Sequence, residues 1–378
     1  MDGNAGRKQN MNRKNEEPVQ ITPIISFAEV QSIIESEFPV EAVVFEFGSP
    51  SFKIKVHPDT KQAFQRLVKK LKPYGLIPLL RSIRGEPTIK VLVKPPVSEK
   101  PSRLPPILFA ITVVTIFISG YINSTVWSRI FQENIYMHAA FFTIALLAIV
   151  GLHELGHKIS AMISGIKSTL PYFIPGPPFP IGFGTLGAVI MQKEPPVNRD
   201  QLFDLGFSGP VTGFIITILV AILAVNMSRI VEPSFMAQLE AQGISLISLP
   251  STLAWELIMT AFAPEAAGNF MLMPPIGMAA WIGFVITYLN LLPAWQLDGG
   301  HIARAMFGEK GHMVASFIGV VVAFLTGFWF FGLLILFLMG RKHMGPLDDL
   351  SPLSRGRLAL GVLAYAILVL SAVVFMPL

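Results

Sequence analysis

Two hydrophobic patterns divide the chain, one over its first part and one over the remainder. In the first part apolar and polar residues alternate, as at 52–56 and 88–94, which is typical of half-buried strands. From residue 107 onward apolar residues form long uncharged runs, which are typical of membrane-spanning helices. The pattern therefore predicts a small water-facing domain followed by a larger membrane domain.

Residues 18–97 are predicted to form a small α+β domain. Its expected elements are an amphipathic helix near 27–38, a basic helix near 58–71, and strand-like segments at 41–56, 76–83 and 88–93. The polar residues 1–17 lack the apolar stretch of a signal peptide, so we expect a disordered cytosolic tail. A proline-rich linker is expected at 98–106.

Residues 107–378 are predicted to be a mainly α-helical membrane domain with about six transmembrane helices. The apolar runs lie at 107–124, 136–163, 202–227, 276–294, 312–339 and 357–376. Basic residues crowd before the first run, which places the N-terminal domain in the cytosol by the positive-inside rule. The run at 312–339 leaves two topologies open. A single crossing puts Arg341 and Lys342 outside, whereas a kinked hairpin turning near Thr326 returns them to the cytosol.

The composition agrees with a membrane protein, because 52% of the residues are hydrophobic and only 14% are charged. A typical soluble domain has about 25% charged residues. The net charge of +5 comes from basic residues in the N-terminal region and short loops, so we expect cytosolic anchoring and no nucleic-acid binding. The chain has no cysteine, so any bound metal must be held by His, Asp or Glu.

One segment of the second apolar run carries metal-site chemistry, namely His153-Glu154-Leu155-Gly156-His157. Two histidines four residues apart on a helix present both imidazoles on one face, where they can bind one Zn²⁺ ion. Glu154 lies near that face and can take a proton from activated water and return it to a leaving amine. The alternative is a set of interhelical hydrogen bonds or a proton relay, although a relay does not require paired histidines.

A catalytic zinc needs a third protein ligand, and the candidate is Asp298. It follows the fourth apolar run on the cytosolic side, and it is the only acid between residues 266 and 307. Pro293 breaks the helix before it, and two glycines after it let the backbone turn sharply. Two alternatives stay open. Asp298 is a solvated residue that caps the next helix, or His301 is the ligand, which we rank lower because it adjoins a flexible turn.

The first motif in a membrane helix, followed by Asn290-Leu291-Leu292-Pro293 and Leu297-Asp298-Gly299, resembles the site-2 protease family of intramembrane metalloproteases. The resemblance covers roughly residues 136–307. It implies that His153, His157 and Asp298 are zinc ligands and that Glu154 is the catalytic base. It also implies that Asn290 helps to position the substrate or the developing oxyanion, although an interhelical hydrogen bond is an equally good interpretation.

Between the second and third apolar runs, residues 172–192 combine prolines with an apolar, glycine-rich segment. The prolines exclude a spanning helix, and the apolar half is more typical of a short hairpin. We predict a re-entrant β-hairpin-like segment beside the metal, to which an unwound substrate adds main chain to main chain. Similar segments occur in the site-2 protease family, and the alternative is an interfacial loop. The expected substrate-binding residues are Gly184, Thr185, Leu186 and Gly187.

The third apolar run contains small residues at a four-residue step, Gly209 and Gly213. This pattern indicates ordinary close packing of membrane helices, and the histidine-bearing helix is the candidate neighbour.

The predicted function is hydrolysis of peptide bonds in or near transmembrane segments by a zinc metalloprotease. The expected partners are transmembrane protein substrates and the lipid bilayer, whereas the sequence does not specify an oligomeric state. A non-catalytic zinc-binding scaffold or a metal transporter is the alternative. Intact Glu154 argues against a scaffold, and a transporter should contain more carboxylates and histidines in its predicted spans.

Overall fold

The structure, a computed structural model, describes residues 25–46, 49–95, 103–244, 246, 248–266, 268–339 and 343–373. The chain forms two compact units, residues 1–95 and residues 96–378, and each is described by itself. The predicted disordered tail at 1–17 lies outside the described residues, as does most of the predicted linker at 98–106.

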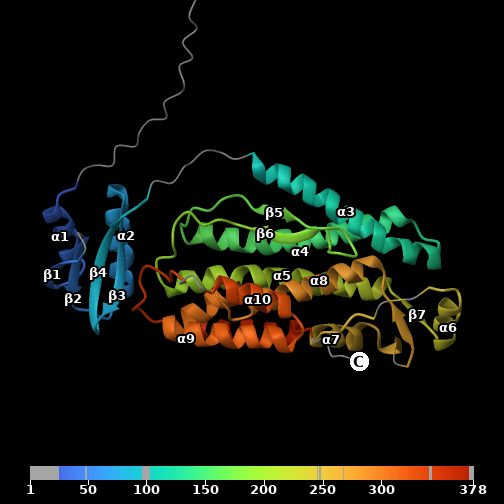
Figure 1. Ribbon diagram of the computed structural model, residues 1–378. Coiled ribbons are helices and arrows are strands. Elements are labelled where there is room, and N and C mark those ends of the chain that lie inside the picture. Colours follow the sequence, from blue (N-terminus) through green and yellow to red (C-terminus); the bar gives the residue numbers. More distant parts are fainter. Residues whose placement is uncertain are drawn as a thin grey trace, which may run out of the picture. The chain divides into compact units, whose positions relative to one another are not determined.

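In the first unit a helix followed by a β-hairpin occurs twice in succession (Figure 1). The elements are α1 (Phe27–Glu35), β1 (Val40–Glu46), β2 (Ser49–Ile54), α2 (Thr60–Leu71), the 3₁₀ turn η1 (Lys72–Tyr74), β3 (Leu76–Ile83) and β4 (Glu86–Val93). The strands form one antiparallel sheet in the order β1-β2-β4-β3, so the two hairpins join through their second strands. Every helix and strand predicted for this unit is present, although the segment at 41–56 is divided into two strands.

Local sequence explains where the first helix begins and which sheet residues are buried. Ser26 Oγ accepts a hydrogen bond from the Glu29 N–H (3.3 Å), and Glu29 Oε2 accepts one from the Ser26 N–H (2.8 Å). This capping box begins α1. On β2 and β4 the alternate residues Phe52, Ile54 and Ile89 are buried, as a period of two requires. The alternation in the sequence therefore corresponds to one buried face of the sheet.

The second unit is mainly helical, with two short two-stranded sheets (Figure 1). Its helices are α3 (Leu104–Phe131), α4 (Ile135–Ile163), α5 (Arg199–Met227), α6 (Pro233–Ala241), α7 (Leu253–Phe262), α8 (Pro275–Leu291), α9 (Asp298–Leu325), α10 (Trp329–Leu338), α11 (Arg355–Ser371) and the 3₁₀ turn η2 (Pro264–Ala266). The antiparallel sheets pair β5 (Tyr172–Pro175) with β6 (Thr185–Val189), which form a hairpin, and β7 (Arg229–Val231) with β8 (Phe270–Leu272), which α6, α7 and η2 separate in the sequence. Helix α5 is central, because it contacts α4, α8 and α9.

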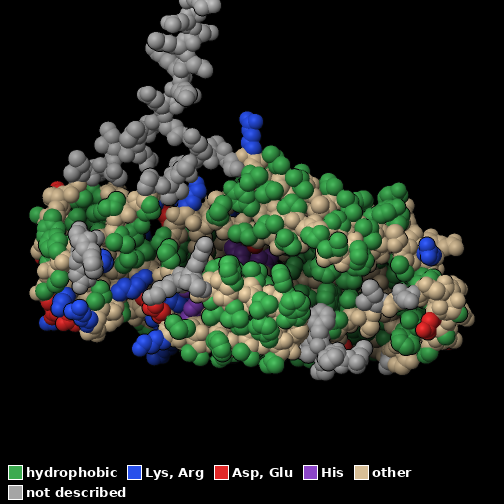
Figure 2. Space-filling model, viewed as in Figure 1, with side chains coloured by type: hydrophobic (Ala, Val, Ile, Leu, Met, Phe, Trp, Pro, Cys, Tyr) green, Lys and Arg blue, Asp and Glu red, His purple; other side chains and the backbone are tan. Residues whose placement is uncertain are grey.

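Four helices of the described residues, α3, α4, α5 and α9, are long and apolar enough to cross a membrane. Helices α8 and α10 are apolar but shorter. Exposed side chains on the long helices are also apolar, including Ile144, Leu219 and Phe317, and hydrophobic atoms cover most of the visible face of this unit (Figure 2). The second unit is therefore a mainly helical membrane domain.

The predicted run at 312–339 is not one helix. Its first half completes α9, which begins at Asp298 and is kinked at Gly308, where φ is 70°. The chain then turns at Gly327 (φ 89°), and α10 packs back against α9. After α10 the Asp348 N–H donates to the Val197 carbonyl (2.7 Å) near the start of α5. The chain therefore returns to the end of the domain where α5 and α9 begin, as the hairpin, one of the two topologies left open by the sequence, requires.

Candidate metal centre

Helix α4 carries both histidines of the first motif on one face. Because His153 and His157 are one helical turn apart, their Nε2 atoms lie 3.1 Å from each other. One ligand atom from each histidine and one carboxylate oxygen of Glu154 all lie within 4.8 Å of one another.

The chain after α8 brings Asp298 to the two histidines. Its Oδ2 lies 3.2 Å from His153 Nε2 and 3.3 Å from His157 Nε2. Asp298 is the first residue of α9, and Leu297 occupies the capping position before it. The carboxylate therefore faces the histidines from a second helix, and it is not a solvated capping group.

The three atoms fit a tetrahedral zinc site. Zinc bonds of 2.0–2.2 Å at tetrahedral angles place ligand atoms about 3.3–3.5 Å apart. Here the separations are 3.1, 3.2 and 3.3 Å. Two imidazoles and one carboxylate are also a donor set of catalytic zinc sites, in which the fourth position stays open. The residues present therefore fit a zinc ion.

A backbone contact orients one of these imidazoles. His157 Nδ1–H donates to the carbonyl oxygen of Leu205 on α5, at 2.7 Å. A carbonyl can only accept, so the proton of the neutral ring is on Nδ1 and the lone pair is on Nε2. Such partners fix the tautomer and the ring orientation of metal-binding histidines. The His157 ring is thus prepared to bind a metal through Nε2.

Glycines on α5 make room for the site. A Cβ added at Gly209 would overlap the His157 ring, and one added at Gly213 would lie 3.0 Å from His153 Nδ1. On the facing helix, a Cβ at Gly156 would lie 2.6 Å from the Ser208 carbonyl oxygen. The predicted close packing against the histidine-bearing helix is confirmed, and it brings α5 directly behind the two rings.

Two polar residues in the second half of α9 hold the loop before Asp298. His312 Nε2–H donates to the Trp295 carbonyl (2.9 Å), and the Trp295 N–H donates to Ser316 Oγ (3.0 Å). These bonds support a strained turn, because Trp295 has a φ of 47°, which is unusual for a residue other than glycine. Neither His312 nor Ser316 was predicted from the sequence. The available signal was two polar side chains, four residues apart, in an apolar run.

A cavity of about 240 Å³ adjoins the three ligand atoms. Histidine side chains are visible at a hollow in the apolar surface of this unit (Figure 2). Besides the three candidate ligands, the lining includes Glu154, Asn290, His301, Gln296, Gln192 and the backbone segment 188–190. The structure thus brings the candidate base and Asn290 to one space beside the candidate metal ligands.

Of the four predicted substrate-binding residues, Thr185, Leu186 and Gly187 are the first three residues of β6, and Gly184 directly precedes the strand. Thr115 Oγ1 donates to the Gly184 carbonyl (2.6 Å), so Gly184 is packed against α3. Thr185 is buried and Leu186 is exposed, and none of the residues 184–187 lines the cavity. The residues that line it are the next three, 188–190. The cavity therefore adjoins the end of the predicted strand.

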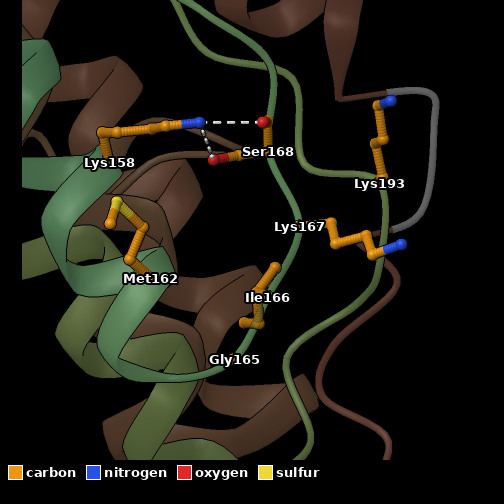
Figure 3. Close-up of a pocket in the computed structure, with 7 residues that line it drawn as sticks. All are labelled: Lys158, Met162, Gly165, Ile166, Lys167, Ser168 and Lys193. Carbon is orange, nitrogen blue, oxygen red and sulfur yellow. Dashed lines mark hydrogen bonds between the residues drawn. The ribbon is translucent and has the colours of Figure 1, made fainter. Parts of the chain in front are cut away.

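A second hollow, of about 360 Å³, lies at the C-terminal end of α4 (Figure 3). Lys158 Nζ donates there to the Ser168 carbonyl (2.8 Å), Ser168 Oγ (3.1 Å) and the Thr169 carbonyl (3.0 Å). All three N–H bonds of the ammonium group are thus used within the protein. Lys158 therefore holds the segment that leads from α4 to the β5–β6 hairpin.

The N-terminal end of α4 contains a different polar cluster. His138 is buried, and its Nε2 lies 2.6 Å from Glu133 Oε2. Trp127 Nε1–H donates to the same carboxylate (3.0 Å), and Arg229 pairs with its other oxygen (3.0 Å). The Trp127 hydrogen bond, together with those from Arg229 and His138, lowers the pKa of Glu133 to about 2 despite partial burial.

Comparison with known proteins places the chain in a family of proteases. The family model described as peptidase family M50 matches residues 141–334, which is half of the chain and contains the whole candidate site. The chain therefore belongs to peptidase family M50. The resemblance to site-2 proteases that the two motifs indicated is confirmed.

Among curated proteins, the chain is similar to the probable zinc metalloprotease EGY2, chloroplastic, of Oryza sativa subsp. indica. The two are 27% identical over 241 residues, which cover 61% of this chain and 41% of the relative. It is also similar to the probable zinc metalloprotease EGY1, chloroplastic, of Arabidopsis thaliana, with 28% identity over 172 residues, or 44% of this chain and 29% of the relative. The matches thus span less than half the length of these relatives. No solved structure matches the chain significantly.

Proposed function

We propose that the chain is an intramembrane zinc metalloprotease, which hydrolyses peptide bonds in or near transmembrane segments of other membrane proteins. The observation that carries the proposal is the arrangement of His153 Nε2, His157 Nε2 and Asp298 Oδ2 at tetrahedral separations. These atoms belong to α4 and α9, two helices able to cross a membrane. Membership of family M50 and the names of the similar proteases support the same activity.

The metal ligands, Glu154 and Asn290 have separate roles in the proposed hydrolysis. His153, His157 and Asp298 would hold the zinc ion, which supplies the Lewis acidity that activates water and polarises a carbonyl group. Glu154 lies in the same cavity, where its carboxylate accepts the proton that water loses and returns it to the leaving amine. Asn290 also lines the cavity, and its side-chain amide would donate to the carbonyl oxygen as negative charge develops there.

The β5–β6 hairpin is the proposed site of substrate binding. In the described part of the second unit, β6 pairs with β5 alone, so its other edge is open to an extended peptide. Segment 188–190 would bring that peptide to the cavity, and Gly184, Thr185, Leu186 and Gly187 would bind its more distant part. Substrate helices must unwind before they can add to this edge, because their main-chain groups are already hydrogen-bonded.

In the proposed topology the site lies toward the cytosol, and residues 18–97 form a cytosolic domain followed by the membrane protease domain at 107–378. The basic residues before α3 support this orientation. Helices α8 and α11, added to the four long helices, give six crossings or partial crossings. The hairpin β5–β6 would be re-entrant, since its strands lie beside α3 and α4.

The alternatives are a zinc-binding scaffold and a metal transporter, and one experiment separates them from a protease. The full chain is purified in nanodiscs, and its zinc content and its cleavage of single-span substrates are measured beside Glu154→Gln. We expect one zinc per chain in both proteins and a loss of cleavage of about 10²–10⁴-fold in the variant. Zinc binding without cleavage by the unaltered chain favours a scaffold, and equal cleavage by both proteins removes Glu154 as the base.

A further inference from the structure

A hydrogen-bonded pair of histidines connects the cavity to the chain that returns after α10. His301 lies one helical turn after Asp298 on α9, and it lines the cavity. Its Nδ1 lies 2.9 Å from Nε2 of His343. The His301 ring is therefore engaged on one side by a residue from a segment distant in the sequence.

One backbone amide determines which ring nitrogen carries the proton in each of the two histidines. The Gly345 N–H donates to Nδ1 of His343 at 3.0 Å. Because an amide N–H can only donate, that Nδ1 carries a lone pair, and the proton of neutral His343 is on Nε2. His343 therefore donates to His301 Nδ1, which must carry a lone pair in turn. The proton of neutral His301 is then on Nε2.

The surroundings of His343 keep it a neutral hydrogen-bond donor to His301. Burial, reinforced by the neighbouring His301, His312 and Arg304, lowers the pKa of His343 to about 2, so the ring stays neutral. Its segment is also fixed, because Arg304 donates to both carboxylate oxygens of Asp349, at 2.9 and 2.7 Å. The donor to His301 is therefore uncharged and held in place.

The remaining ring nitrogen of His301 is the one available to a ligand. Within the described residues its Nε2 has no hydrogen-bond partner, and it is not among the polar atoms that are buried without one. Since the residue lines the cavity, this Nε2 is accessible from it. The cavity thus contains an N–H donor whose direction is set from the far side of the ring.

We propose that His301 donates this Nε2–H to a main-chain carbonyl oxygen of the substrate beside the metal ligands, and that His343 is a positioning residue that maintains the required tautomer. The proposal rests on the proposed protease function. The opposite tautomer would present a lone pair to the carbonyl oxygen and repel it. A tautomer fixed by hydrogen bonds therefore gives His301 a permanent role as a donor, beside the amide of Asn290 in the same cavity.

Two substitutions of His343 separate this role from simple packing. In His343→Gln the side-chain amide can still donate to His301 Nδ1, whereas in His343→Glu the ionised carboxylate can only accept. The zinc-loaded full chain and both variants are compared in nanodiscs. Nitrogen-15 NMR of histidine-labelled protein reports the tautomer of His301, whose signals are assigned by their loss in His301→Asn. Kinetics are measured at a pH where the NMR signals show a single proton on His301.

We expect the unaltered chain and His343→Gln to show the Nε2–H tautomer and kcat values within about threefold of each other. His343→Glu should show the Nδ1–H tautomer and a kcat/KM at least about tenfold lower, with unchanged zinc content. An Nδ1–H tautomer in the unaltered chain, equal impairment of both variants, or full activity of His343→Glu would overturn the proposal. If the unaltered chain cleaves no better than Glu154→Gln, the proposed protease function is wrong. The NMR measurement still shows which tautomer His301 adopts.

Discussion

Both ends of α4 place a buried histidine against a carboxylate, but the two clusters differ in what completes them. At the N-terminal end Glu133 is already bound by His138, Trp127 and Arg229. At the other end, two imidazoles converge on Asp298 and a cavity adjoins them. In the first cluster both carboxylate oxygens of Glu133 are paired within the protein, and in the second cluster three metal-binding atoms face a shared point.

This difference shows how a structural polar cluster in a membrane helix is distinguished from a reaction site. Polar groups in apolar surroundings are costly in either case, so burial alone does not separate the two. A carboxylate whose oxygens are all hydrogen-bonded within the protein indicates a structural role. Convergent lone pairs, glycines that clear space behind the rings, and an accessible cavity indicate a ligand.

The largest expected effect is the loss of metal from one end of α4 only. His157→Ala removes one of three candidate ligands and should abolish both stoichiometric zinc binding and cleavage. His138→Ala, on the same helix, should keep one zinc per chain. Zinc analysis of the purified proteins checks both. Equal zinc content in the two variants would contradict the assignment of separate roles to the two ends.

A smaller effect is expected from a methyl group placed behind the metal ligands. Gly209→Ala would push against the His157 ring and should weaken zinc binding by about 10–100-fold, as disturbed ligand orientation does. Gly151→Ala on α4 is the matched control, because its added Cβ would meet only Phe173 at an ordinary 3.7 Å. Competition with a chelator measures the affinities. Indistinguishable affinities would mean that α5 does not shape the site.

The smallest effect is expected at the N-terminal cluster and concerns stability. Glu133→Gln should lower the free energy of unfolding by about 1–3 kcal/mol at neutral pH and leave zinc binding unchanged. The pKa of Glu133 is lowered in the folded state, from 4.5 to about 2. Its contribution is therefore complete above pH 4.5 and is lost as the pH falls toward 2. Denaturant unfolding of both proteins across this range should show their difference shrinking, and a constant difference would argue against the ionised cluster.

The sequence allowed much of the fold to be predicted, where each element depends on its own residues. The strands at 76–83 and the helices at 136–163 and 202–227 are close to β3, α4 and α5, because period and length are local signals. The division of the run at 312–339 between α9 and α10 was one of two topologies that the sequence left open. It depends on a turn at Gly327 and on contacts such as that between Arg304 and Asp349, which are made between distant segments.

The candidate site shows the same limit. His153 and His157 follow from helical spacing, and Asp298 from its isolation among apolar residues, and the structure brings all three together. The supporting contacts were not predictable. The carbonyl of Leu205 that orients His157 has no side-chain signature, and His343 meets His301 only through the return of the chain after α10. Orientation of a ligand by backbone or by distant segments has no short-range pattern in the sequence.

The most direct test of the central claim is X-ray absorption spectroscopy at the zinc edge on the purified full chain, beside Asp298→Ala. The account predicts nitrogen and oxygen ligands at about 2.0–2.2 Å, with two imidazoles and one carboxylate. In the variant the carboxylate contribution should be lost, or the zinc itself should be absent. A chain without stoichiometric zinc, or a spectrum unchanged by Asp298→Ala, would contradict a metal centre built from α4 and the start of α9.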